Sequence, residues 1–502
     1  MVGRRRRLGK YADVRFADPP WNEDHPDWIR LNEELPADHP ARQMLGAMQV
    51  LDLTPLYASY SAGGTRPIRP DLMLRVMLIE MQLGRYRPCQ WFRDVREHIP
   101  LMWAGFGIRP SRGCWYEFAD RVAPFLDAWN RQVLDESRRR KITTATRGAL
   151  DGSTVAANAS RHRLLNEEQL TKRQAQLQQV CAGDAVGEAT ETLPGWMATT
   201  RRGRIEQCQR LDEARVRLGE LQAIAQRQQP NRRRPAEKIV VSSSDPQAAL
   251  GRDKLKVFRP LYNVQLVRDL DSTLILGYDL FAQPGDDGTL KPMLKRLRET
   301  FGILPETLLA DAAYATACNL ALSRRQAVTL CAPWQENDFT QPKKAAKKKA
   351  GSPKLTKDKF EWLPDENAYR CPQGHCLTVI GKECRLQSDG EVNTVYRYRC
   401  LPRHCRACPQ RDACTSNPDR GRSLRRSEHE DLIETHKACM QTDAAKALYK
   451  LRRQTVELGF ADLKEHRNFE RFSGRGRHRA RRQLALTVLA HNLTRLTRAP
   501  PP

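Results

Sequence analysis

Strand and helix patterns alternate over residues 256–335, and this alternation restricts the fold more than any other feature of the chain. Two apolar, β-branched runs, at 259–268 and 272–281, flank turn residues that begin at Asp269, which predicts a β-hairpin. The patterns that follow are those of a helix at 289–302, a strand at 307–310, a helix from Thr316 and a strand at 328–332. Antiparallel strands followed by strands that alternate with helices predict a mixed sheet with flanking helices, in the α/β class.

Residues 1–135 have a different pattern, which predicts an N-terminal helical domain. From Arg69 to Phe106 apolar residues recur at spacings of three and four, and Ser111 is placed to cap a further helix. Arginines are spread through this region: Arg69, Arg75, Arg85, Arg87, Arg93, Arg96 and Arg112. A compact helical module that binds DNA has this composition, and so does a helical bundle with an ordinary charged surface.

The chain of 502 residues has 85 lysines and arginines against 59 aspartates and glutamates, a formal net charge of +26. This excess indicates a polyanionic partner, and nucleic acid is the first candidate because cationic side chains release counterions from phosphates. A ribosome-associated or merely basic protein is the alternative. The sequence has no apolar run of the roughly 18–20 residues that a membrane span needs, and no apolar region follows its basic start as in a secretory signal. We therefore expect a cytoplasmic protein with no membrane partner.

Changes in composition predict the remaining boundaries. The α/β domain is expected over 141–335, and a charged, Gln-rich helical insertion at 161–238 interrupts it. Residues 336–424 contain a Lys-rich, low-complexity linker at 342–358 and then a cysteine-rich segment. Helical patterns return over 425–498, which we expect to hold the closing helices.

Two aspartates have settings that suit metal-dependent chemistry on phosphodiesters. Asp151 lies in the middle of a predicted strand among apolar and small residues, where an unpaired charge is costly. Asp311 follows the strand at 307–310, and α/β sheets place ligands at the C-terminal ends of strands. A few carboxylates that hold two Mg²⁺ ions would neutralise the attacking and leaving oxygens of the reaction. For each aspartate, a turn residue or helix cap is the alternative.

A third carboxylate comes from helical geometry. At about 100° per residue, Tyr449, Arg453, Glu457 and Lys464 share one stripe of a predicted helix beside an apolar flank. This arrangement suits a metal ligand with phosphate-binding neighbours. An ordinary amphipathic helix, in which Arg453 and Glu457 form an i, i+4 ion pair, is the alternative.

Together these segments resemble the DDE transposases of bacterial insertion sequences, whose catalytic domain has a ribonuclease-H-like fold. Asp151 and Asp311 lie in segments similar to the family's two aspartate motifs, Leu-Asp-Gly-Ser-Thr-Val-Ala-Ala-Asn and Leu-Leu-Ala-Asp-Ala-Ala-Tyr. The family's helix pattern, Tyr-x2-Arg-x3-Glu-x6-Lys, is matched at Arg453, Glu457 and Lys464, whereas Tyr449 is one residue too far from Arg453. Further likeness covers residues 69–106, 245–248, 262–265 and 469–492.

The resemblance implies Mg²⁺-dependent cleavage and strand transfer at the ends of a mobile element, with Mn²⁺ as a substitute metal. Asp151, Asp311 and Glu457 would bind the two ions, and the choice of Glu457 over Glu465 rests on helical phase and on the resemblance. Arg453 and Lys464 would contact the DNA backbone, with Tyr449 as a further contact. The partners would be double-stranded DNA, as element ends and target, and a second copy of the chain in a homodimer at the bacterial nucleoid.

Half of the 14 cysteines lie between Cys371 and Cys414, and this clustering indicates a structural Zn²⁺ site rather than scattered free thiols. The spacing Cys405-x2-Cys408-x5-Cys414, preceded by Cys371-Pro-Gln-Gly, predicts these four cysteines as the ligands. Some transposases of the same group carry a similar insertion before the glutamate helix. The competing ligands are Cys376, Cys384, Cys400, His375 and His404.

Two other functional classes fit the same residues. A non-enzymatic DNA-binding protein, such as a degenerate transposase, would keep the charge, the helices and the zinc site. A structure-specific nuclease on the same fold would hydrolyse DNA without joining strands. Metal-dependent cleavage separates the first class from a transposase, and strand-transfer products separate the second.

Overall fold

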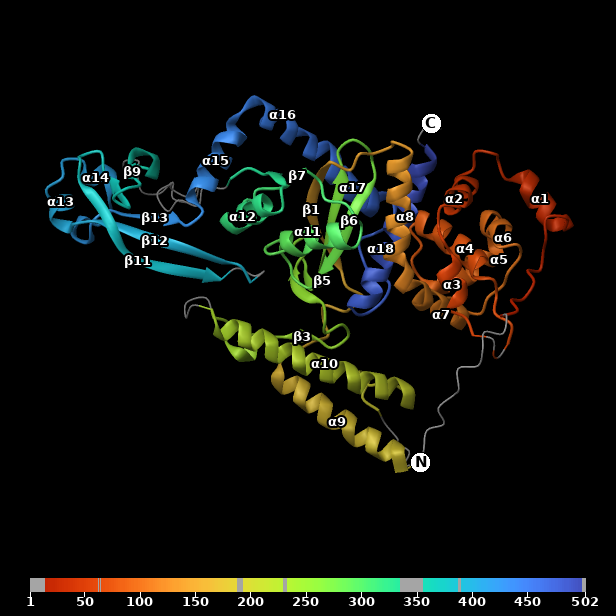
Figure 1. The fold of residues 1–502 in the computed structure, drawn as a ribbon. Helices are drawn as coiled ribbons and strands as arrows, with labels where there is room; N and C mark the ends of the chain where they lie inside the picture. The colour runs from red at the N-terminus through yellow and green to blue at the C-terminus, as the bar shows by residue number, and fades with distance from the viewer. Residues whose placement is uncertain are drawn as a thin grey trace. The chain divides into compact units, whose positions relative to one another are not determined.

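A computed structural model describes residues 14–61, 63, 65–186, 193–228, 233–334, 355–386 and 390–498 (Figure 1). Most of the predicted Lys-rich linker at 342–358 lies outside these residues. The chain divides into two compact units. The first comprises Met1–Gly285, Lys295–Leu304 and Arg453–Pro502, and the second comprises Asp286–Leu294 and Pro305–Arg452.

The N-terminal part of the first unit is helical, as predicted. Its helices are α1 (Pro26–Glu34), α2 (Pro40–Met48), α3 (Thr54–Ala58), α4 (Pro70–Gln82), α5 (Pro88–Glu97), α6 (Ile99–Ala104), α7 (Arg112–Val122) and α8 (Leu126–Arg139), with a 3-10 turn η1 (Ala123–Phe125). From α1 to α6, a proline in the first turn supplies the backbone angle that starts each helix. The predicted cap of α7 is confirmed, because Ser111 Oγ accepts a hydrogen bond from the Cys114 amide at 3.1 Å.

The sheet of the first unit is built around one long strand. Strand β5 (Phe258–Asp269) pairs antiparallel with β1 (Arg147–Ala156), β4 (Ala249–Arg252) and β6 (Ile275–Phe281). The predicted hairpin at 259–281 is therefore confirmed as β5 and β6. In β6, Gly277 lets Leu297 approach the strand closely, because a Cβ at this position would clash with the leucine side chain.

The long C-terminal helix α18 (Arg477–Arg498) packs against both layers of the first unit. It contacts α2, α4 and α8 of the helical part, and strand β6 of the sheet (Figure 1). The side chain of Asn492 accepts a hydrogen bond from the Ile275 amide and donates one to the Ile275 carbonyl, both at 2.9 Å. Because these groups are buried, the two bonds fix the position of the helix along the strand.

The predicted helical insertion is a helical hairpin with its own small core. It comprises β2 (Leu164–Leu165), α9 (Glu167–Val186), α10 (Arg201–Gln226), a 3-10 turn η3 (Ala236–Lys238) and β3 (Val241–Ser242), and β2 pairs antiparallel with β3 at its base. Buried leucines from both helices, among them Leu177 and Leu211, form the core. A buried ion pair between Arg204 and Asp184, at 2.6 Å, also joins the two helices.

The second unit contains two groups of strands. Strand β7 (Thr307–Leu309) pairs parallel with β8 (Thr329–Cys331), and helix α12 (Ala317–Arg325) connects them. Five antiparallel strands follow in the order β13-β12-β11-β10-β9: β9 (Glu361–Leu363), β10 (Ala368–Arg370), β11 (Cys376–Leu386), β12 (Val392–Cys400) and β13 (Ser423–Ser427). The remaining helices of this part are η5 (Lys357–Lys359), α13 (Pro402–Arg406), α14 (Arg411–Cys414), η6 (Pro418–Arg420), α15 (Glu430–Gln441) and α16 (Asp443–Arg452). Helix α11 (Leu290–Glu299) has residues in both units.

Two expectations about the closing helices are wrong. The helical pattern expected from Arg425 begins only at Glu430, because residues up to Ser427 continue β13 and pair with β12. The glutamate helix is also not a continuous α-helix. It contains two π-helical turns, η7 (Arg453–Glu457) and η8 (Asp462–His466), separated by α17 (Leu458–Ala461).

The class of the fold is mixed α/β, as predicted. None of the helices in the described part of the chain has the length and apolarity needed to cross a membrane.

Replacing Asn492 by alanine should destabilise the first unit by about 2–4 kcal/mol, because two buried backbone groups of Ile275 would lose their partner. Thermal melting of the full chain measures the effect. Asn22→Ala, at an exposed position, is the control and should change stability by less than about 0.5 kcal/mol. Equal melting temperatures for both variants would show that α18 is held by its apolar contacts alone.

Candidate functional site

Asp151 lies in the middle of β1, the strand that the sequence predicted for it. It pairs with Leu266 of β5 and is half-buried, between the buried Leu150 and the more open Gly152. An acidic side chain in this position is held on a rigid element and is only partly desolvated. A carboxylate in this setting suits a cationic partner, because an uncompensated charge is costly when it is partly buried.

The segment that carries Glu457 packs along the same strand. The π-helical turn η7 contacts both β1 and β5, and Arg268 of β5 donates a hydrogen bond to the Thr455 carbonyl at 2.6 Å. Further along, Ala156 at the end of β1 donates its amide to the Glu470 carbonyl at 3.0 Å and accepts from the Phe472 amide at 2.9 Å. The structure therefore brings the elements of two predicted ligands, Asp151 and Glu457, into contact.

Lys464 binds to β1 as well. Its ammonium group donates to Ser153 Oγ at 2.7 Å and to the Thr154 carbonyl at 3.1 Å. Burial, and then the positive charge of Lys254, lower the pKa of Lys464 to about 8. The side chain predicted to contact DNA thus also links the glutamate helix to the strand of Asp151.

The π-helical turns change the angular positions of the side chains that were predicted to share one stripe of the helix. A π-helix closes its hydrogen bonds over five residues instead of four, so its residues do not advance by the α-helical angle. The phase calculated for a continuous α-helix therefore does not hold through Arg453 and Glu457. Both side chains are nevertheless exposed, as is the competing Glu465 in η8. π-Helical turns inside α-helices are frequent at functional sites.

Asp311 and Tyr449 belong to the second unit. Asp311 directly follows β7 and Ala310, as predicted, and its Oδ1 accepts a hydrogen bond from the Ala313 amide at 2.8 Å. Tyr449 lies in α16, where it lines a shallow pocket with Trp334 and Lys446.

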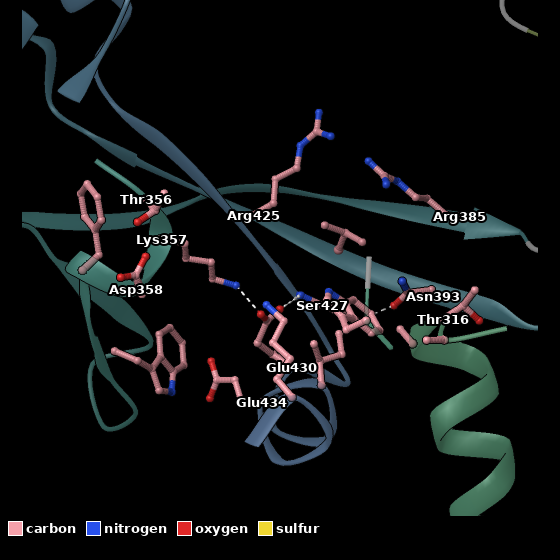
Figure 2. Close-up of a pocket in the computed structure, with 18 of the residues that line it drawn as sticks. Thr316, Thr356, Lys357, Asp358, Arg385, Asn393, Arg425, Ser427, Glu430 and Glu434 are labelled. Atoms are coloured by element: carbon pink, nitrogen blue, oxygen red, sulfur yellow. Dashed lines mark hydrogen bonds and ion pairs between the residues drawn. The ribbon is translucent and has the colours of Figure 1, made fainter. Parts of the chain in front are cut away.

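A second pocket, of about 870 Å³, is lined by Ala312 and Ala313, which directly follow Asp311. Thr316 and Asn393 line it as well (Figure 2). Its opposite wall comes from the five-stranded sheet and α15, where Lys357 points toward Glu430 and forms an ion pair of 2.5 Å with it. Arg385 and Arg425 also line this pocket. It therefore combines cationic and anionic groups in the second unit.

Several of the clustered cysteines share one small core. Cys400, Cys405 and Cys414 are buried in it, and Cys371 packs against its edge. The Arg422 amide donates a hydrogen bond to Cys405 Sγ at 3.3 Å. Burial, and then the neighbouring thiol of Cys405, raise the pKa of Cys400 to about 12.

The other candidate ligands are arranged differently. Cys408 influences the pKa of Cys414 and so lies near this core, whereas Cys376 and Cys384 are exposed on β11. His375 and His404 stack on each other with ring centroids 4.2 Å apart. Among the residues that the structure describes, no group of three or more His, Cys, Asp or Glu side chains is placed to hold a metal ion. Cys400, which was a competing ligand and not one of the four predicted ones, is buried in the same core.

The glutamate helix also contacts α18 through Asp462 and the buried His491, a contact that the sequence analysis did not predict. In η8, Asp462 Oδ2 lies 3.5 Å from His491 Nδ1 of α18 and 3.4 Å from Arg467 Nε. The other ring nitrogen of His491 is 2.9 Å from the Thr273 carbonyl. The interaction with His491 holds the pKa of Asp462 well below its usual range, and burial lowers the pKa of His491. These residues are far apart in the sequence, so only the fold reveals the contact.

Part of the chain is similar to a known protein family. Residues 370–497 match the model of the transposase DDE domain. This match supports a transposase of the DDE superfamily. The match includes the cysteine-rich segment, the glutamate helix and most of α18, about a quarter of the 502 residues. No curated protein and no solved structure matches the chain.

The DDE transposase match has a direct bearing on the third carboxylate. Glu457, Arg453 and Lys464 all lie inside the matched residues, together with Asp462 and His491. The two aspartates precede the matched region, so their assignment rests on their strands and on the motifs around them.

Low pH should reduce the stability that His491 contributes through its contact with the glutamate helix. His491 has a lowered pKa in the fold, so its contribution to stability is present above the unfolded value of about 6.5 and is lost as the pH falls below it. His491→Gln should lower the melting temperature at about pH 7.5, and the gap to wild type should narrow at about pH 5.5. His478→Gln, exposed near the start of α18, is the control. A gap that is constant with pH would contradict a neutral, buried histidine.

Proposed function

We propose that this chain is a DNA transposase with a ribonuclease-H-like catalytic domain, which cleaves the ends of a mobile element and joins them to target DNA. One observation carries the proposal: the helix inside the transposase match, with Glu457, packs along the strand that carries Asp151. The formal net charge of +26 supports DNA as the partner. Assembly as a homodimer on two element ends is part of the proposal.

Asp151, Asp311 and Glu457 would hold the metal ions. Three carboxylates, with Asp151 partly buried on a strand and Glu457 exposed on a helix, are the hard oxygen donors that Mg²⁺ and Mn²⁺ prefer. The bound ions would supply charge neutralisation at the attacking and leaving oxygens of the phosphodiester. The two metal ligands of the first unit stand on elements that hydrogen bonds fix to each other, which favours a preorganised site.

The residues around these carboxylates have separate tasks in the proposal. Arg453 is exposed in the same π-helical turn as Glu457 and would contact the phosphate backbone. Lys464 orients the helix on β1 through its hydrogen bond to Ser153. Because its pKa is lowered to about 8, it loses its proton at a lower pH than an exposed lysine does. Tyr449 would contact the DNA from the second unit. The pocket that begins at Ala312 would receive DNA beside Asp311.

We also propose that Cys371, Cys405, Cys408 and Cys414 bind a structural Zn²⁺ ion. Two observations fit this donor set: the shared core of Cys371, Cys405 and Cys414, and the amide of Arg422 that donates to Cys405 Sγ. Hydrogen bonds to sulfur stabilise the thiolate form that zinc requires. The ion would tie α13 and α14 to the end of β10.

Cleavage of DNA that contains the sequences flanking the gene tests the carboxylates. With Mg²⁺, Asp151→Asn, Asp311→Asn and Glu457→Gln should each lower the cleavage rate by about 10²-fold or more, because the metal site loses a charged ligand. DNA binding should persist, since cationic contacts remain. Glu465→Gln, on the same helix, is the matched control and should keep the activity. Loss of cleavage in Glu465→Gln alone would move the third ligand to Glu465.

The same assay separates the functional classes. A wild-type protein that binds DNA but never cuts it would favour the non-enzymatic alternative. Cleavage without any joined products would favour a nuclease.

Zinc is tested by the metal content of the purified protein. About one zinc ion per chain is expected, and Cys405→Ser/Cys408→Ser should lose it together with part of the thermal stability. Cys376→Ser/Cys384→Ser, at exposed positions on β11, is the matched control and should retain the ion. Wild-type protein without zinc would contradict the site.

A further inference from the structure

A small pocket at the base of the helical hairpin has an unusual concentration of arginines. Its volume is about 240 Å³, enough for several water molecules at roughly 30 Å³ each. Arg173 of α9, Arg210 of α10, Arg163 beside β2 and Arg475 in the loop before α18 all line it. All of these residues belong to the first unit.

Few negative charges lie close to the arginines of this pocket. Within the described residues, no acidic side chain lines the pocket, and none of the four guanidinium groups takes part in an ion pair. Burial, and then the charge of Arg163, lower the pKa of Arg173. Burial, and then the charge of Arg475, likewise lower the pKa of Arg210. Arg163 therefore repels Arg173, and Arg475 repels Arg210.

The nearest acidic groups do not cancel this charge. Glu206 and Glu213 flank Arg210 on α10 and partly offset its repulsion from Arg475, but neither lines the pocket. Asp245 influences Arg475 from a buried position. Its two oxygens already accept hydrogen bonds from the Tyr262 hydroxyl at 2.8 Å and the Gly476 amide at 3.0 Å.

Neighbouring contacts hold the arginines in place. The guanidinium of Arg173 lies 5.0 Å from the ring centre of Trp196, in a cation–π contact. The Arg163 carbonyl accepts hydrogen bonds from the Ser243 amide at 3.2 Å and hydroxyl at 3.1 Å, which tie its backbone to the segment after β3. The bond from Gly476 to Asp245 anchors the loop that carries Arg475. The Arg173 side chain and the backbones that carry Arg163 and Arg475 are therefore positioned before an anion binds.

We propose that this arginine pocket (Arg163, Arg173, Arg210 and Arg475) binds phosphate groups of the DNA backbone, so that the helical insertion is a DNA-contacting arm of the protein. The proposal rests on the proposed function for the presence of DNA and adds a contact site outside the carboxylate site. Guanidinium groups form paired hydrogen bonds to phosphate oxygens, and the Ser244 hydroxyl that lines the pocket adds a neutral donor. Such contacts carry no base preference.

The test measures binding of the full-length protein to a labelled duplex of arbitrary sequence at several salt concentrations. Each phosphate contact contributes about 0.9 to the slope of log affinity against log salt. Arg173→Gln/Arg210→Gln should therefore lower the slope by about 1–2 and weaken binding roughly tenfold near 0.1 M salt. The double variant Lys172→Gln/Arg202→Gln removes the same charge from exposed positions of the same two helices, and its slope should stay close to that of wild type.

Thermal melting separates a lost contact from a lost fold. The melting temperature of the pocket variant should equal or exceed that of wild type, because the substitutions remove repulsion between partly buried and neighbouring cations. Inorganic phosphate should raise the melting temperature of wild type at millimolar concentrations, well below those that stabilise the pocket variant. Equal salt slopes for the pocket and control variants would overturn the proposal. Failure of wild type to bind any duplex would overturn the proposed function itself.

Discussion

The first unit depends on buried polar contacts made by its last helix, α18. Asn492 pairs with both backbone groups of Ile275, a residue 217 positions earlier in the chain. Near the other end of the helix, the Ala485 carbonyl accepts a hydrogen bond of 3.2 Å from Asn130 of α8, which also reaches the Tyr278 hydroxyl of β6. Apolar packing alone would tolerate small shifts of a helix along a sheet, whereas satisfied buried amides fix one register. The N-terminal helices, the sheet and α18 therefore form one unit.

The same helix sets the position of the glutamate helix. His491 of α18 contacts Asp462 in η8, while Lys464 in that turn reaches β1 from the other side. The segment with Glu457 is thereby attached at two points, one to α18 and one to the strand of Asp151. The short, partly exposed π-helical segment of η7 and η8 would not be stable by itself. Its contacts with the helical core therefore stabilise it.

Local patterns were enough to predict many of the elements, because their causes are local. The proline start of α4, the Ser111 cap and the hairpin of β5 and β6 all follow from residues that are close together in the sequence. Strand β13 was missed because its evidence is distant: Arg426 is buried against the Tyr369 hydroxyl, and the strand pairs with β12. In the same way, the contact between Asp462 and His491 and the arginine pocket join residues from separate parts of the chain. The sequence shows such residues but not that they meet.

The π-helical turn η7 has a consequence for how relatives of this chain can vary in length. A π-helical turn holds one residue more than an α-helical turn, so it amounts to a single-residue insertion that the helix absorbs locally. The spacing between Tyr449 and Arg453 is likewise one residue longer than the pattern of the family. We therefore expect an extra or missing residue within η7 to change the type of turn there. Alignments of this chain with DDE transposases should therefore place a gap inside the segment of Arg453–Glu457.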